Sequence, residues 1–89
     1  MDYVNYVVLK LVNQLDEIIR WPKKPSDKEA IVKYLATKFE LDKTYSEKEI
    51  NGIIDKYHLF NDIALLRKEL VSRKFLARLD DGSKYWKIN

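Results

Sequence analysis

The sequence predicts a mainly α-helical fold that ends in a β-hairpin. Four stretches repeat apolar residues at the spacing of a helix with one buried face, at about 2–19, 27–39, 46–58 and 62–74. After them, the segment Leu76–Trp86 alternates around Asp81–Gly82, a pair that favours a tight turn. The 89 residues suffice for one domain with a single core, and the absence of cysteine excludes disulfides and thiolate metal sites.

The first helix is expected from about Asp2 to Ile19, ended by Trp21–Pro22 because a residue before proline leaves the α region. Its apolar arc is wider than one core needs. Two interpretations stay open: the helix is sandwiched within its own domain, or its excess face packs against a second copy of the chain. In the second case the protein is a homodimer, and its dimerisation residues are Val4, Val8, Leu11 and Leu15.

The second helix is expected from Asp27 to about Phe39, after the basic, proline-stiffened connector "WPKKPSD". Ser26 is a good N-cap residue for it. The predicted buried stripe of this helix consists of Ile31, Tyr34, Leu35 and Phe39.

The start of the third helix is predicted by "SEKE" at Ser46–Glu49, which has the pattern of a capping box. This helix is expected to run to about His58, a position where the imidazole can meet the carbonyls of the helix end. Thr44–Tyr45, just before the cap, is a candidate short strand.

The fourth helix is expected to be capped by Asn61 or Asp62 and to end near Lys74. It turns Ile63, Leu66 and Leu70 inward. Only about three residues join it to the helix before, as a helix-turn-helix motif requires.

The C-terminal hairpin is expected to have a two-residue type I′ turn at Asp81–Gly82. This register pairs Leu79 with Lys84, Ala77 with Trp86 and Phe75 with Ile88. Because opposite residues share a face, one side is predicted to face the core and the other to face solvent. The predicted inner residues are Phe75, Ala77, Leu79, Trp86 and Ile88, and the predicted outer residues are Leu76, Arg78, Tyr85 and Lys87.

Together these elements predict a winged helix-turn-helix preceded by an extra N-terminal helix. The expected division is 1–20 for the N-terminal helix and 21–89 for the winged-helix domain.

Four motifs carry a family resemblance: "WPKK" at Trp21–Lys24, "YSEKEIN" at Tyr45–Asn51, "HLFNDIALLRKELV" at His58–Val71 and "FLARLDDGSKYW" at Phe75–Trp86. From about Ile19 to Lys87 the chain thereby resembles domain-of-unknown-function family 2087, a small bacterial domain. Its members occur alone or attached to ArsR-type winged-helix regulators. The resemblance implies a link with transcription regulation by analogy of fold and fusion partners.

An enzyme is not expected, because the chain has one histidine, no glycine-rich phosphate loop and no cluster with metal-ligand spacing. No cofactor and no metal are therefore expected. No apolar run approaches the length needed to span a bilayer, and no signal peptide is apparent, so a cytoplasmic protein without a membrane partner is expected.

Double-stranded DNA is the expected partner, since residues 61–89 carry seven basic and four acidic side chains. Asn61, Lys68 and Ser72 lie on the expected reading side of the fourth helix. Arg67 lies nearer its buried edge and is expected either to touch phosphate or to pair with a carboxylate such as Asp62 or Asp55. In the hairpin, the expected wing contacts are Arg78, Lys84, Tyr85 and Lys87.

Two alternatives remain open on the same scaffold. A protein-interaction module is indicated by the wide apolar arc of the first helix and by Ala64–Leu65 on the reading side of the fourth. A ligand-sensing module would use Tyr3, Tyr6, Trp21 and Tyr34, although aromatic residues at helical spacing are more often plain core.

Overall fold

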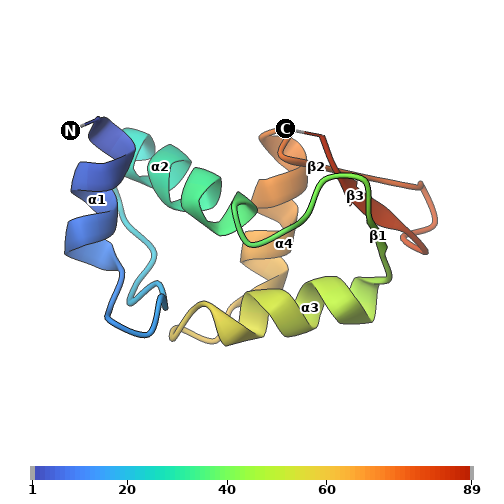
Figure 1. The fold of residues 1–89 in the computed structure, drawn as a ribbon, viewed down its shortest axis with the longest axis horizontal. Helices are drawn as coiled ribbons and strands as arrows, with labels where there is room; N and C mark the ends of the chain where they lie inside the picture. The colour runs from blue at the N-terminus through green and yellow to red at the C-terminus, as the bar shows by residue number, and fades with distance from the viewer. Residues whose placement is uncertain (1, 89) are drawn as a thin grey trace.

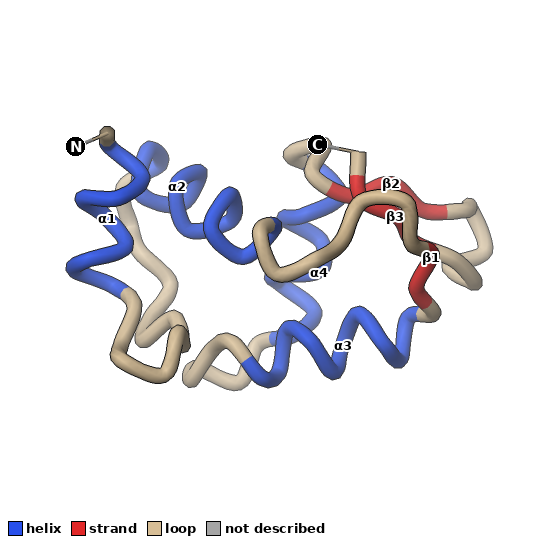
Figure 2. The backbone as a smooth tube through the Cα atoms, viewed as in Figure 1, coloured by secondary structure: helices blue, strands red, loops and turns tan. Residues whose placement is uncertain are grey.

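The computed structural model describes residues 2–88, within which the chain forms four helices and three short strands (Figure 1). In chain order the elements are α1 (Tyr3–Leu11), α2 (Pro25–Ala36), β1 (Thr44–Tyr45), α3 (Glu47–Lys56), α4 (Ile63–Ser72), β2 (Leu76–Arg78) and β3 (Tyr85–Lys87). Helices α1 and α2 pack together at one end of the molecule, and the sheet lies at the other end (Figures 1 and 2). The predicted mainly α-helical fold with a C-terminal hairpin is confirmed.

Helix α1 ends at Leu11 and not at Ile19, so the predicted length of the first helix is wrong. The helix stops because Asn13 organises a turn, in which its Oδ1 accepts the backbone N–H of Glu17 at 3.0 Å. Asparagine side chains commonly compete with helical backbone bonds in this way. Beyond the turn the chain runs back along the domain, and Ile18 is fully buried there as part of a loop.

Helix α2 begins at Pro25, which corrects the predicted start at Asp27 and the predicted cap at Ser26. Proline suits the first helical position, because its φ is already helical and its missing N–H would have had no partner there. The helix ends at Ala36, earlier than predicted, and Phe39 is buried in the loop that follows.

Helix α3 begins with the predicted capping box, which is confirmed in both directions. The Ser46 hydroxyl accepts the backbone N–H of Glu49 at 3.1 Å, and the Glu49 carboxylate accepts the backbone N–H of Ser46 at 2.9 Å. The predicted short strand at Thr44–Tyr45 is also confirmed. The helix ends at Lys56, close to its predicted end at His58.

The turn between α3 and α4 is stabilised by hydrogen bonds of His58, which is only 4% exposed. Its Nε2 accepts the backbone N–H of Asp62 at 2.9 Å, and its Nδ1 lies 2.7 Å from the carbonyl oxygen of Ile54. Since Nε2 accepts, Nδ1 carries the proton and donates to that carbonyl. Asp62 is the N-cap of α4, as one of the two predicted alternatives, and α4 ends at Ser72, slightly before the predicted Lys74.

The three strands form an antiparallel sheet in the order β1-β3-β2. The predicted register is confirmed, with Ala77 opposite Trp86. The predicted turn type is wrong, because a type I′ turn needs positive φ at both central residues, and only Gly82 has it (φ 76°) while Asp81 does not. The Gly82 N–H instead donates to the Leu79 carbonyl at 2.9 Å, which gives a longer connection.

The hairpin packs on the core with the opposite face from the one predicted. Leu76 and Tyr85, predicted to face solvent, are 1% and 2% exposed. The face predicted to be inner is turned outward, and its most exposed members are Leu79 (43%), Trp86 (36%) and Ile88 (45%).

Strand β1 accounts for this choice of face. Tyr45 pairs with Tyr85 across the sheet, and both side chains lie on the core side. The Tyr45 ring also meets Phe39 edge to face at a centroid distance of 5.6 Å. Arg78 and Lys87 belong to the same face, where they occupy its edges.

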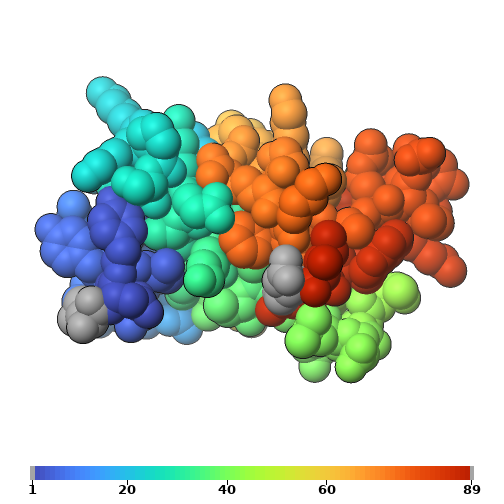
Figure 3. Space-filling view, turned by 90° about the horizontal axis from the view of Figure 1, so that it is seen from above, coloured from blue at the N-terminus to red at the C-terminus, as the bar shows by residue number. Residues whose placement is uncertain are grey.

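Helices α2, α3 and α4 with the sheet form a winged helix-turn-helix, to which α1 is added. One core joins all of these parts through side chains that include Leu11, Leu35, Ile54 and Leu66. Seen from above, the surface of α4 lies between α2 and the hairpin (Figure 3). None of the helices in residues 2–88 combines the length and apolarity required to span a bilayer.

Candidate nucleic-acid interface

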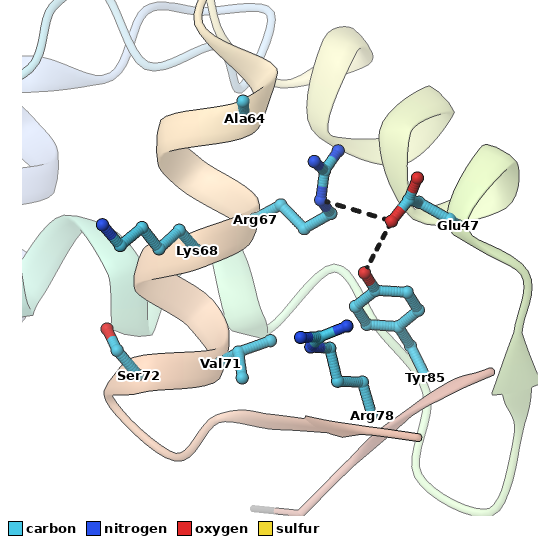
Figure 4. A pocket seen from close by; sticks show the side chains of 8 residues that line it. All are labelled: Glu47, Ala64, Arg67, Lys68, Val71, Ser72, Arg78 and Tyr85. Carbon is cyan, nitrogen blue, oxygen red and sulfur yellow. Dashed lines mark hydrogen bonds and ion pairs between the residues drawn. The ribbon is translucent and has the colours of Figure 1, made fainter. Parts of the chain in front are cut away.

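A groove of about 490 Å³ lies between the outer surface of α4 and the hairpin. Helix α4 places Leu66 and Leu70 in the core, where both are fully buried, and this fixes which of its residues face outward. Three other elements complete the lining, as Figure 4 shows. The lining residues are Glu47 from α3, Ala64, Arg67, Lys68, Val71 and Ser72 from α4, Arg78 from β2 and Tyr85 from β3.

The side of α4 that faces the hairpin holds a hydrogen-bonded network around Glu47 (Figure 4). Its carboxylate oxygen accepts the Tyr85 hydroxyl at 2.9 Å and lies 3.8 Å from Nε of Arg67. Arg67 Nη1 also donates to the side-chain oxygen of Asn51 at 2.6 Å. Arg67 is therefore paired internally, and its carboxylate partner is Glu47, not Asp62 or Asp55.

Tyr85 is a core residue, and its hydroxyl is the part of its side chain that reaches the groove. Burial raises its pKa above the ordinary tyrosine value, and the neighbouring Glu47 carboxylate raises this pKa further. The hydroxyl therefore stays protonated and remains a donor to Glu47 at neutral pH. Its ring, predicted to lie on the outer face of the hairpin, is instead packed in the core.

Arg78 extends from β2 toward α4 on this same side (Figure 4). Its side chain is exposed and makes only a 3.5 Å contact with the carbonyl oxygen of Asp80. Among residues 2–88 it forms no ion pair, although it reaches the groove that also contains Glu47. Its positive charge is thus available to a ligand.

Lys68 and Ser72 lie on the other side of α4 (Figure 4). Both are exposed, and within the described part of the chain Lys68 has neither a hydrogen bond nor an ion pair. Arg73, one residue after the helix, differs from Lys68, because it is bound at 2.7 Å by both Glu29 and Glu69. The exposed surface of α4 therefore has an available cation on each side, Lys68 on one and Arg78 on the other.

Three predicted contact residues lie outside the groove. Asn61 precedes the cap of α4 in the left-handed region, with φ 53°. Lys84 is exposed beside the hairpin turn. Lys87 is half-buried and donates from Nζ to the Phe39 carbonyl at 3.2 Å, away from α4. The structure thus brings together Arg67, Lys68, Ser72, Arg78 and Tyr85 of the predicted set.

The four predicted dimerisation residues do not share one exposed face. Leu11 is 2% exposed within the core of its own domain. Val4 and Val8 are half-buried, and Leu15 is 76% exposed in the loop after α1. The most exposed apolar side chains of α1 are Tyr3, Tyr6 and Leu9.

Besides Ala64, which was expected on the reading side of the fourth helix, two groove residues had no place in the predicted site, and each has a recognisable signal. Val71 belongs to the outward stripe that contains Ala64 and Lys68, at seven- and three-residue spacing. Glu47 lies inside the predicted capping box Ser46–Glu49, yet Glu49 is the residue that completes this box. The side chain of Glu47 was therefore left without an assigned partner in the sequence.

Metal binding gains no support within the described residues, since no group of three or more His, Asp or Glu side chains there is placed to hold an ion.

The fold and groove define a winged-helix-like domain, and the comparisons add a family. A family model described as "Uncharacterized protein conserved in bacteria (DUF2087)" matches residues 17–87. The chain therefore belongs to this bacterial family, and the resemblance inferred from its motifs is confirmed. Helix α1 lies before the matched range. No curated protein and no solved structure matches the chain.

Proposed function

We propose that this domain is a non-enzymatic, DNA-binding module of a transcription regulator, in which α4 enters the major groove and the hairpin lies along the backbone. The observation that carries the proposal is the pair of available cations on opposite sides of one exposed helix surface, Lys68 and Arg78. A helix in the major groove has phosphates on both sides, and positive side chains at both borders suit that geometry.

The surface between these cations supports the same placement. Ala64 and Val71 present small or compact apolar groups, which can approach the thymine methyl group in the major groove. An α-helix of roughly 10–12 Å diameter also fits a major groove of about 12 Å width. With only Lys68 and Ser72 as polar side chains on the outer side, phosphate contacts are expected to contribute more affinity than base reading.

The test is fluorescence anisotropy with a short random-sequence duplex, titrated between about 50 and 200 mM salt. Three cations, Lys68, Arg78 and the hairpin residue Lys84, give an expected slope of log K against log salt of about −3. Changing Lys68 and Arg78 together to glutamine should reduce this slope by about 2.

A matched control removes two positive charges from the α1 end of the molecule, as K10Q with K23Q. Both lysines are exposed and lie outside the groove. The control should keep most of the binding and its salt slope. Absence of wild-type binding at micromolar protein and about 50 mM salt would refute the proposal.

A protein-contact function is the second candidate, and the outer face of the hairpin favours it. Leu79, Trp86 and Ile88 expose 43%, 36% and 45% of their surface on this face. Exposed apolar patches commonly mark partner surfaces. The partner we propose is a second copy, because a homodimer would present two α4 helices to two half-sites. Sedimentation velocity should then show a dimer that W86S converts to monomer, whereas a wild-type monomer would exclude this candidate.

A further inference from the structure

Glu47 is the one carboxylate among the lining residues of a groove that also contains Arg67, Lys68 and Arg78. Its side chain is 49% exposed, so it faces both the protein and any ligand in the groove. The capping box of α3 does not use it, because Glu49 completes that box. Its position therefore calls for an explanation other than helix capping.

The contacts of Glu47 place it between the two arginines on the hairpin side of α4. Its Oε1 lies 3.8 Å from Arg67 Nε. At the hairpin turn, a side chain added to Gly82 would begin 3.6 Å from Glu47 Oε1 and 3.5 Å from Arg78 Nη1, so these two groups are at most about 7 Å apart. The Tyr85 hydroxyl fixes the carboxylate by donating to the same oxygen at 2.9 Å.

We infer that Glu47 is a built-in counter-charge that limits phosphate binding on the hairpin side of α4. This inference rests on the proposed function and states which residue limits phosphate binding at the proposed DNA-binding site. Glu47 neutralises Arg67 and repels a phosphate that approaches it, so Arg78 supplies the net positive charge of this side. Within the groove, phosphate contacts are accordingly confined to Arg78 on one side of α4 and to Lys68 on the other, while Lys84 contributes from the hairpin outside the groove.

Arg67 then has a different role from the one its charge suggests. It is held by Glu47 and by Asn51, both on α3, and is only 26% exposed. It is a positioning residue that ties α3 to α4 in the helix-turn-helix, whereas Lys68 and Arg78 are the phosphate contacts.

The experiment measures duplex binding by E47Q across the same salt range as for the wild type. Glutamine keeps an oxygen that can accept the Tyr85 hydroxyl but removes the negative charge. We expect the affinity near 50 mM salt to rise about fivefold, the effect of removing one charge at roughly 4 Å in water. The salt slope should steepen by up to about 0.9, because Arg67 becomes available as a further cation.

The matched control is E40Q. Glu40 pairs with Lys43 at 3.7 Å outside the groove, so this variant changes the net charge equally and also releases a cation. It should leave the slope unchanged. Equal slopes for E47Q and E40Q would overturn the inference while leaving the proposed function intact. Failure of the wild type to bind would instead refute the proposed function, and the inference with it.

A second pair of variants keeps the test decisive if E47Q does not fold, which its circular dichroism spectrum will show. The double variant E47Q/R67Q removes both charges of this pair, so it should leave the salt slope of binding unchanged and lower the melting temperature. K68Q should reduce the slope by about 0.9 with little change in melting temperature. A reduction of the slope by E47Q/R67Q as large as that by K68Q would overturn the inference.

Discussion

The two faces of the C-terminal sheet differ in burial: the face with two basic side chains packs against the core, and the more apolar face is exposed. The face that carries Arg78 and Lys87 packs on the core through Leu76 and Tyr85, which are almost completely buried. The more apolar face is exposed to solvent at Leu79, Trp86 and Ile88, each of which is more than a third exposed. Apolar content along a hairpin therefore did not decide which face was buried.

The polar side chains of the inner face explain how it can be buried. Tyr85 satisfies its hydroxyl on Glu47, and Lys87 runs its aliphatic stem along the protein and reaches the Phe39 carbonyl with its ammonium group. Arg78 lies at the border and extends into the groove beside α4. The inner face thus contributes to the core and to the candidate interface together, while the outer face contributes to the core only at its edge, through the partly buried Phe75.

The largest expected effect that would test this comparison is on stability. L76A should lower the free energy of unfolding by about 2–5 kcal/mol, because it leaves a cavity in the core. L79A, on the outer face, should cost less than about 1 kcal/mol. Urea unfolding curves of both variants measure the difference, and equal losses would contradict the assignment of the two faces.

A smaller effect is expected from removing the Tyr85 hydroxyl from the inner face. Y85F should cost about 1 kcal/mol of unfolding free energy, the usual net value of one hydrogen bond. Y6F is the matched control, since Tyr6 is 52% exposed and its contacts are through its ring. A loss in Y85F no larger than in Y6F would show that the bond to Glu47 contributes nothing.

The hydrogen bond between Tyr85 and Glu47 should also affect the pH dependence of the unfolding free energy, although by a smaller amount. The folded protein raises the pKa values of Tyr85 and Tyr34, in both cases mainly through burial. A raised folded pKa means that the native state retains the proton longer than the unfolded chain, whose tyrosines titrate near about pH 10. Stability should therefore be complete below about pH 10 and fall as the pH rises through the folded pKa values.

Urea unfolding at several alkaline pH values will measure this decline. The fall should be shallower in Y85F, which lacks one of the two groups. An identical decline in wild type and Y85F would show that Tyr85 does not titrate differently in the two states.

The smallest expected effect is on the outer face. I88T should change the unfolding free energy by no more than about 0.5 kcal/mol, because Ile88 is 45% exposed and its backbone bond to Phe75 is unaffected. Thermal melting of this variant is the measurement. A loss approaching that of L76A would mean that the outer face is covered in the protein.

Local chemistry in the sequence predicted much of this fold. The capping box of α3, the Asp62 cap of α4 and the hairpin register each depend on residues a few positions apart, and all three are confirmed. The end of α1 was missed although its cause is also local. Asn13 breaks an apolar pattern that otherwise continues to Ile19, and periodicity alone gives no weight to a side chain that bonds its own backbone.

The face of the hairpin that packs on the core could not be predicted from residues close together in the sequence. Alternation separates two sets of residues but does not say which set meets the core. That choice depends on Tyr45, which joins the sheet from far along the chain. The candidate site divides in the same way: Lys68 and Ser72 follow from the helical period, whereas the Glu47 network needs α3, α4 and β3 in contact.

The central claim is that the surface formed by α4 and the inner edge of the hairpin binds duplex DNA. The most direct measurement is an NMR titration of isotope-labelled protein with a short duplex. We expect shifts of the backbone amides of Lys68, Ser72 and Arg78, with the Trp86 and Ile88 amides of the outer face unmoved. Shifts centred on Trp86 and Ile88, or none at all, would contradict the account.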